Sequence, residues 1–251
     1  MVICIKKERG VRLLIEDNWR NLEWLRDGRS LIDWISNVED KAQVILFVRH
    51  SHRLHSEDQH ELLHMQLTPL GHEMAREFGK HLPRRGHLEI FHSEHPRCLE
   101  TAEGILKGYQ DTNQLATIRG PIRELLGPQV VTSIGKELSE YGIDGFINRW
   151  AKGEFPESQI ESIQNYGERI WTNTVVNLNS NSTIPFYVHV SHDLVLMSFR
   201  KTILGINATH DNWIPFLGGF GIIKIEDNYQ WIERGEVYEV NGFSYDCGGE
   251  F

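Results

Sequence analysis

The sequence predicts an α/β fold, a three-layer sandwich with a mostly parallel central sheet flanked by helices. Strand-like apolar runs at 44–48, 88–91 and 186–190 alternate with helix-like segments, which is the order expected of such a sheet. The first run is apolar at every position, as strands buried on both faces are. All three runs change abruptly to polar residues, and ligands of open α/β sheets bind beyond the carboxyl ends of the strands.

The first strand leads directly into a basic cluster. Val44 to Val48 is followed by Arg-His-Ser-His-Arg at 49–53. A buried strand cannot hold five such groups, so the cluster is predicted to lie where the strand leaves the sheet and to bind an anion such as a phosphate. Taken alone, this stretch is also compatible with a polar loop that happens to be basic.

The helices between the strands carry recognisable boundary signals. Thr68 is predicted to cap a helix with Pro69 at its first position, and Pro96 suits the first turn of the next helix. A further helix is expected over 157–178. A buried helix over 194–204 is predicted to end at Gly205.

The remaining segments complete a single domain over 1–251. Residues 1–40 are expected to form an N-terminal decoration of a hairpin (2–16) and a helix (18–37), and 130–156 a cap over the sheet. Strands are expected at 115–118 and 218–226, with an edge ribbon over 229–240.

Composition excludes several classes of function. The net charge is -9 and no basic footprint is spread along the chain, so no nucleic-acid partner is expected. No apolar run approaches the roughly 20 residues of a membrane span, and the first residues lack the apolar core of a signal peptide, so no membrane association and a cytoplasmic location are expected. Three dispersed cysteines form no disulfide framework or cysteine metal site. The sequence does not indicate the oligomeric state.

The polar side chains that follow three predicted strands are expected to lie together at one edge of the sheet. The first strand supplies Arg49, His50 and Arg53, the second supplies Arg97, and the last supplies His192 and Asp193. The second and third sets also lie at predicted helix N-termini, where free N–H groups and the helix dipole favour anions.

These residues resemble the histidine phosphatase superfamily, which includes acid phosphatases, phytases and phosphoglycerate mutases. The matching motifs, in the family order, are Arg49-His50, Leu67-Thr68-x-x-Gly71, Ser93-x-x-x-Arg97-x-x-x-Thr101-Ala102 and Ser191-His192-Asp193. The four motifs span residues 44 to about 205, so the resemblance covers most of the chain.

The resemblance implies a metal-independent phosphomonoesterase that needs no cofactor. His50 would be the nucleophile that forms a phosphohistidine, and the residues implied to bind phosphate are Arg49, Arg53, Arg97 and His192. The substrate would be a small phosphorylated molecule or a phosphoprotein.

The implied proton donor has two candidates. Arg53 and Asp193 resemble the acid-phosphatase branch, in which the aspartate after the second histidine donates the proton; Glu124 lies about where the mutase-like branch has its glutamate. Asp193 is the favoured donor and Glu124 the reserve, and an acid-base pair of this kind predicts a bell-shaped pH profile. The family usually has glycine where this chain has Ser51, a side chain that could crowd the pocket or add a hydrogen bond.

Other functions remain open. His60-Glu61-Leu62-Leu63-His64 fits the H-E-x-x-H zinc motif, although the chain has 13 histidines and no third ligand is indicated. A phosphomutase, or a phosphate-binding module without catalysis, could use the same fold. We set aside Cys98 as a thiol nucleophile because the residue six positions later is Gly104 and not an arginine.

Overall fold

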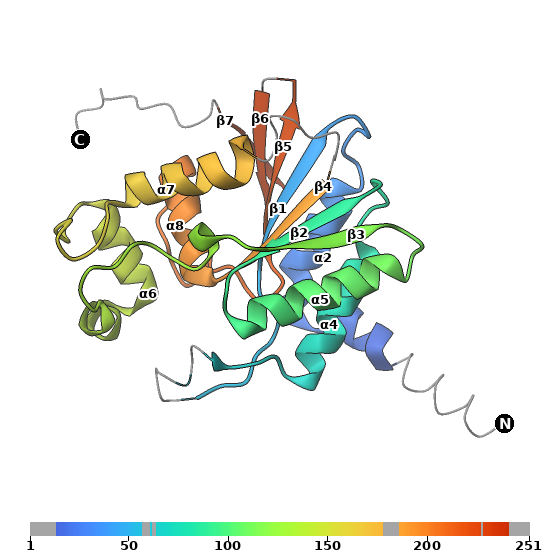
Figure 1. Ribbon diagram of the computed structural model, residues 1–251, viewed down its shortest axis with the longest axis horizontal. Helices are drawn as coiled ribbons and strands as arrows, with labels where there is room; N and C mark the ends of the chain where they lie inside the picture. The colour runs from blue at the N-terminus through green and yellow to red at the C-terminus, as the bar shows by residue number, and fades with distance from the viewer. Residues whose placement is uncertain (1–13, 57–60, 62–63, 178–185, 227, 241–251) are drawn as a thin grey trace.

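The computed structural model has a seven-stranded sheet between two layers of helices (Figure 1). The structure describes residues 14–56, 61, 64–177, 186–226 and 228–240. The strands lie in the order β3-β2-β4-β1-β5-β6-β7, and the first four run parallel, while β5, β6 and β7 extend the sheet as an antiparallel meander. The predicted α/β fold class is confirmed.

The strands are β1 (Gln43–Arg49), β2 (Leu88–His92), β3 (Ala116–Pro121), β4 (Phe186–Ser191), β5 (Gly219–Ile225), β6 (Asn228–Glu233) and β7 (Glu236–Val240). The α-helices are α2 (Arg26–Ile35), α4 (Pro69–His81), α5 (Pro96–Gln110), α6 (Gly135–Ala151), α7 (Ile163–Trp171) and α8 (Asp193–Leu204). Short helical turns are η1 (Glu23–Leu25), η2 (Arg123–Leu125) and the π-helical η3 (Thr172–Val176).

The central strand β1 divides the core into two. Its residues 44–48 are completely buried, and successive side chains point to opposite faces. Val44, Leu46 and Val48 join the cluster beneath α2, α4 and α5, whereas Ile45 and Phe47 join the cluster beneath α6, α7 and α8. Figure 1 shows these two helix groups on opposite sides of the sheet.

The helix boundaries follow the capping signals in part. Thr68 caps α4 by accepting a hydrogen bond from Gly71 N (3.0 Å), and Gly205 ends α8 with φ of 69°. The helix predicted over 157–178 is shorter than expected, because Ser162 accepts from Asn165 N and starts α7 there. None of the described helices has the length and apolar character needed to cross a membrane.

The N-terminal segment is built into the main core. The predicted hairpin over 2–16 falls mostly outside the described residues, and its last residues, 14–16, are helical, so the strand prediction is wrong there. The helix over 14–21 packs Ile15 and the buried Trp19 against the core, which a strand end at this position would not do. Leu31 and Ile35 of α2 belong to the same core cluster.

One residue in the middle of the core is titratable. His189, in the middle of β4, is paired with Phe47 on β1 and Phe91 on β2, and both rings stack on its imidazole at 4.9 and 5.2 Å. Neither imidazole nitrogen has a partner at good hydrogen-bond geometry among the described residues. Complete burial lowers the pKa of His189 to about 3, so the folded protein holds it neutral.

His189 should therefore destabilise the protein in acid. Below pH 6.5 the unfolded chain binds a proton on this imidazole that the folded protein excludes, and stability is lost as the pH falls from there towards 3. Between pH 7.5 and 5.5 the free energy of unfolding of the wild type should fall by about 1.4 kcal/mol more than that of His189→Leu. Urea denaturation at both pH values measures this difference. The exposed His55→Leu is the matched control and should follow the wild type; identical pH dependence in all three proteins would contradict the account.

Candidate active site

Adjacent parallel strands bring the predicted phosphate ligands to one edge of the sheet. In the order β2-β4-β1, Arg49 ends β1, Arg97 lies in the first turn of α5 after β2, and His192 caps α8 after β4. The peptide N–H of His50 donates to Ser191 O (2.9 Å), which continues the β1–β4 pairing into the site. The strand ends converge as the sequence predicts.

The hydrogen bonds of His50 define which ring nitrogen carries a lone pair. Its Nδ1 lies 2.8 Å from Ser51 O, and because a carbonyl can only accept, Nδ1 must carry the hydrogen. Nε2 is then an acceptor, and Arg97 Nε donates to it at 3.2 Å. Burial, followed by the charges of Arg49 and Arg97, lowers the pKa of His50 well below 6.5. His50 is therefore a buried, neutral imidazole with its lone pair inside the cluster.

Arg97 joins the two histidines of the site. Its Nη2 lies 3.2 Å from His192 Nδ1, so this guanidinium contacts both imidazoles. His192 Nε2 lies 2.9 Å from Ser93 Oγ, which fixes the opposite side of the ring. Burial, together with the nearby positive charges, lowers the pKa of His192 as well. The nearby thiol of Cys98 is no nucleophile, since burial raises its pKa to about 12.

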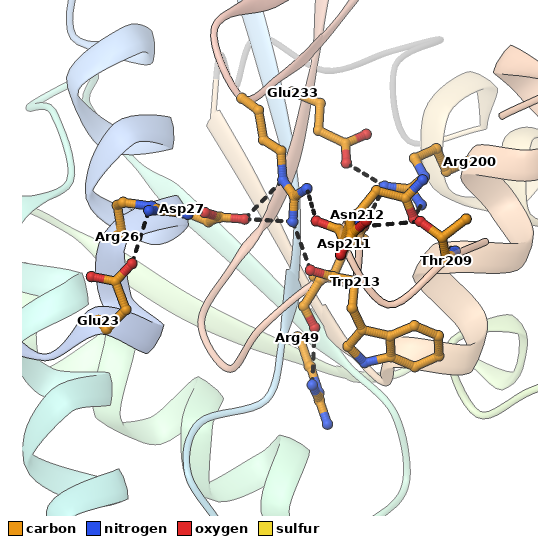
Figure 2. A network of polar contacts seen from close by, with 12 residues as sticks. Glu23, Arg26, Asp27, Arg49, Arg200, Thr209, Asp211, Asn212, Trp213 and Glu233 are labelled. Atoms are coloured by element: carbon orange, nitrogen blue, oxygen red, sulfur yellow. Dashed lines mark hydrogen bonds and ion pairs between the residues drawn. The ribbon is translucent and has the colours of Figure 1, made fainter. Parts of the chain in front are cut away.

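Arg49 connects three elements around the site. Its Nη2 pairs with Asp193 Oδ2 on α8 at 2.6 Å, and its Nη1 donates to Ile214 O at 2.9 Å, a bond visible in Figure 2. Its guanidinium also lies 4.3 Å from the centre of the Phe216 ring. Asp193 Oδ1 accepts from Leu194 N at 2.9 Å, so both carboxylate oxygens have donors.

Arg53 contributes a third positive charge. It forms an isolated β-bridge with Leu67, and its Nη1 donates to Leu54 O at 2.8 Å. Burial lowers the pKa values of Arg49 and Arg97, and the positive charge of Arg53 lowers them further. Three arginines therefore lie around His50, and among the described carboxylates Asp193 is in direct contact with one of them, Arg49.

Ser51, the departure from the family pattern, adds a hydrogen bond. Its buried hydroxyl donates to Gly71 O at 2.8 Å, and its peptide N–H donates to Thr101 Oγ1 at 3.0 Å. Both contacts hold the loop after β1 against α4 and α5. Gly71 is required there, because a Cβ at this position would lie 2.0 Å from His52 O.

Glu124, the second proton-donor candidate, is engaged elsewhere. It lies in η2, and its Oε1 accepts from Arg169 Nη1 at 2.8 Å, while Arg169 also pairs with Glu161. No described contact joins the Glu124 carboxylate to the arginine cluster. The residue after it, Leu125, is tied to the end of β4, since Ser191 Oγ donates to Leu125 O at 2.7 Å.

Sequence reasoning missed several residues around the cluster. Phe216 lies 5.6 Å from the His50 ring, and Trp24 of η1 packs on Phe216 and His52 at 6.0 and 5.9 Å. A cavity of about 450 Å³ also opens beside Asp193, partly lined by Trp213. Lone aromatics in an irregular segment carry no sequence signal, because only the fold brings 213–216 onto the end of β1.

The alternative zinc motif lies partly outside the described residues. His60, Leu62 and Leu63 are not described, while Glu61 and His64 are helical and Glu61 Oε2 accepts from Ser56 Oγ at 2.6 Å. Within the described part of the chain, no group of three or more histidine, cysteine, aspartate or glutamate side chains is arranged to hold a metal ion.

This fold and cluster define an α/β protein with a buried histidine among arginines at the carboxyl edge of its sheet. Residues 45–234 match the family model of the histidine phosphatase superfamily (branch 1). The chain therefore belongs to the histidine phosphatase superfamily, as its motifs predict. No curated protein matches the chain.

Several solved structures align with the chain at low sequence identity. A phosphoglycerate mutase from Bacillus anthracis str. Sterne aligns with a TM-score of 0.53 and 16% identity, covering 83% of this chain and 97% of that chain. A phosphoserine phosphatase mutant from Entamoeba histolytica, in complex with phosphoserine, aligns with a TM-score of 0.47 and 17% identity, covering 80% and 97%. A mycobacterial glucosyl-3-phosphoglycerate phosphatase gives 0.45 and 14%, covering 80% and 99%.

The close approach at Gly71 predicts the effect of a single methyl group. Gly71→Ala places that methyl against the His52 carbonyl, so the backbone of the loop after His50 must move. The free energy of unfolding should fall by at least about 2 kcal/mol. Denaturant titration measures the loss. Gly145→Ala in α6 is the matched control: its Cβ meets only the Tyr141 side chain, at 3.1 Å, and this variant should retain wild-type stability within about 1 kcal/mol. Equal stability of both variants would contradict the packing described for Gly71.

Proposed function

We propose that the protein hydrolyses a phosphate monoester through a phosphohistidine on His50, without a metal ion. The observation that carries the proposal is the hydrogen bonding of His50. Nδ1 is committed to Ser51 O, so the lone pair of Nε2 is available among the charges of Arg49, Arg53 and Arg97. A neutral, oriented imidazole is the form that can attack phosphorus.

In the first step, the three arginines and His192 bind the phosphate oxygens. The phosphate takes the place that Arg97 Nε now holds at His50 Nε2. The N–P bond forms on Nε2 while the bond from phosphorus to the ester oxygen breaks. The departing oxygen takes a proton and leaves as the alcohol. Phosphoryl transfer depends mainly on positioning and charge stabilisation, which fixed arginines supply.

Asp193 is the proton donor that the geometry favours. It is the described carboxylate in direct contact with the arginine cluster, through Arg49. A phosphate that binds Arg49 would compete with Asp193 for this guanidinium and leave the carboxyl beside the ester oxygen. In the second step, Asp193 accepts a proton from water as the water oxygen attacks phosphorus, which breaks the N–P bond and releases inorganic phosphate.

Glu124 is the alternative donor, and it would have to leave Arg169 to reach the ester oxygen. A phosphomutase is the alternative function, and the similarity of fold to a phosphoglycerate mutase keeps it open. A phosphate-binding module without catalysis would use the same cluster.

The first test is hydrolysis of an aryl phosphate with excess chelator. The wild type should turn over and His50→Ala should lose at least about 1,000-fold in kcat/KM, since the variant lacks the imidazole lone pair that attacks phosphorus in this proposal. Activity of His50→Ala near the wild-type level would contradict the proposal. Loss of wild-type activity with chelator would favour the zinc reading.

Substrates whose leaving groups differ in acidity distinguish the two candidate proton donors. Asp193→Asn should slow hydrolysis of an alkyl phosphate by on the order of 100-fold and that of a nitrophenyl phosphate far less, since a good leaving group needs no proton. Glu124→Gln, the matched carboxamide variant, should affect both substrates alike. The reverse pattern would assign the proton to Glu124.

The pH dependence of kcat/KM gives a further test. His50 must be neutral, and its pKa lies well below 6.5, so the nucleophile stays active as the pH falls through 6.5 and is lost only in stronger acid. The wild-type profile for a substrate whose own ionisation is subtracted should show no acidic limb at 6.5. An acidic limb at 6.5 that persists after this correction would contradict the buried, neutral state of His50.

A further inference from the structure

We infer that the cavity beside Asp193 receives the alcohol part of the phosphate monoester and selects an apolar alcohol that carries no negative charge. This inference rests on the proposed function, because it assigns the substrate class of the same site. The cavity has a volume of about 450 Å³ and is lined by Ile143, Asp144, Asp193, His210, Trp213 and Pro215. This volume lies in the range of small-molecule sites.

Asp193 joins the cavity to the phosphate cluster. Its Oδ2 contacts Arg49, and the same side chain lines the cavity. An ester oxygen between the two would lie next to its proton donor. The group attached to that oxygen would then extend between α6, which carries Asp144, and the segment that carries Trp213.

The walls of the cavity are largely apolar. Ile143 leaves 36% of its surface exposed, and Trp213 and Pro215 are half-buried on the opposite wall. An indole and two aliphatic side chains suit a ring or a short hydrocarbon, whose burial is favourable in proportion to its apolar area.

The charged side chains of the lining are both acidic. Asp193 is already paired with Arg49, but Asp144 makes no hydrogen bond or ion pair among the described residues. Among the described residues that line the cavity there is no lysine or arginine, and His210 is the one basic side chain. A carboxylate or second phosphate on the alcohol would therefore face Asp144 without a fixed cation, whereas a neutral or aminated alcohol would not be repelled.

The wall that carries Trp213 is held by two arginines. Arg200, which is buried, donates to Asn212 O and Oδ1 at 2.9 and 2.7 Å and pairs with Glu233 at 2.7 Å. Arg234 donates to Trp213 O at 2.6 Å and pairs with Asp27 at 2.9 Å. Figure 2 shows this network converging on the segment from Thr209 to Trp213.

The opposite wall depends on a break in α6. Gly142 has φ of 67° and ψ of 173°, which interrupts the helix directly before Ile143 and Asp144. Glycine adopts this conformation readily, whereas other residues do not. A preorganised pocket of this kind selects by shape and charge with little cost of ordering.

The test uses three phenyl phosphates that differ only at one position of the ring. They carry 3-hydroxymethyl, 3-aminomethyl or 3-carboxymethyl groups, so the methylene keeps the acidity of the leaving phenol similar. At pH 8, where histidines are ordinarily uncharged, the wild type should hydrolyse the carboxymethyl substrate with kcat/KM on the order of tenfold below the hydroxymethyl substrate. The aminomethyl substrate should equal or exceed the hydroxymethyl substrate.

Variants of Asp144 test the origin of this discrimination. Asp144→Asn should reduce the tenfold ratio between the neutral and anionic substrates to about threefold or less, and Asp144→Lys should reverse it. Asp211→Asn is the matched control, because Asp211 is an exposed acid of the neighbouring segment that does not line the cavity. Its ratio should equal that of the wild type. A wild type that prefers the carboxymethyl substrate, or a ratio unchanged in both Asp144 variants, would overturn the inference.

A binding measurement separates this inference from the proposed function. By calorimetry, benzylphosphonate should bind the wild type on the order of tenfold more tightly than methylphosphonate, because only the former has a ring to bury. If the phosphonates show this preference and no aryl phosphate is hydrolysed, the cavity is assigned correctly and the proposed hydrolysis fails. If hydrolysis depends on His50 but the ring and its charge make no difference, the proposed hydrolysis holds and the cavity inference fails.

Discussion

The rest of the site depends on the contacts of one group, the guanidinium of Arg49. It ends the central strand β1 and contacts Asp193 on α8, the carbonyl of Ile214 and the ring of Phe216. These contacts join the sheet, a helix N-terminus and the irregular segment before β5 at one point. The neighbouring cavity exists because that segment is drawn to the strand end by Arg49 and held from behind by Arg200 and Arg234.

Positive charge is concentrated in the site before any ligand binds. Arg49 and Arg97 are buried close to each other and to Arg53, and burial together with the like charges lowers their pKa values. Such an arrangement costs stability, which the surrounding hydrogen bonds and packing offset. A bound phosphate would relieve the repulsion, and burial together with the same charges keeps His50 neutral. One arrangement thus suits both the phosphate binding and the neutral His50 nucleophile that we propose.

The residues nearest the chemistry were predictable from sequence because they follow strands. Arg49, Arg97 and His192 each follow an apolar run within six residues, and parallel strands bring their carboxyl ends to one edge. The bonding of His50 Nδ1 to Ser51 O could not be predicted, since it depends on the loop geometry set by Gly71. Nor could the engagement of Glu124 by Arg169, which comes from α7, 45 residues away in sequence.

The most direct measurement is the identification of the phosphorylated residue. Wild-type protein and Asp193→Asn would be mixed with a nitrophenyl phosphate, quenched within milliseconds to seconds and analysed by peptide mass spectrometry under conditions that preserve acid-labile phosphate. The account predicts one phosphoryl group on His50, with more of it in Asp193→Asn because attack by water is slowed. Phosphate on another side chain, or steady turnover with none on His50 in either protein, would contradict the account.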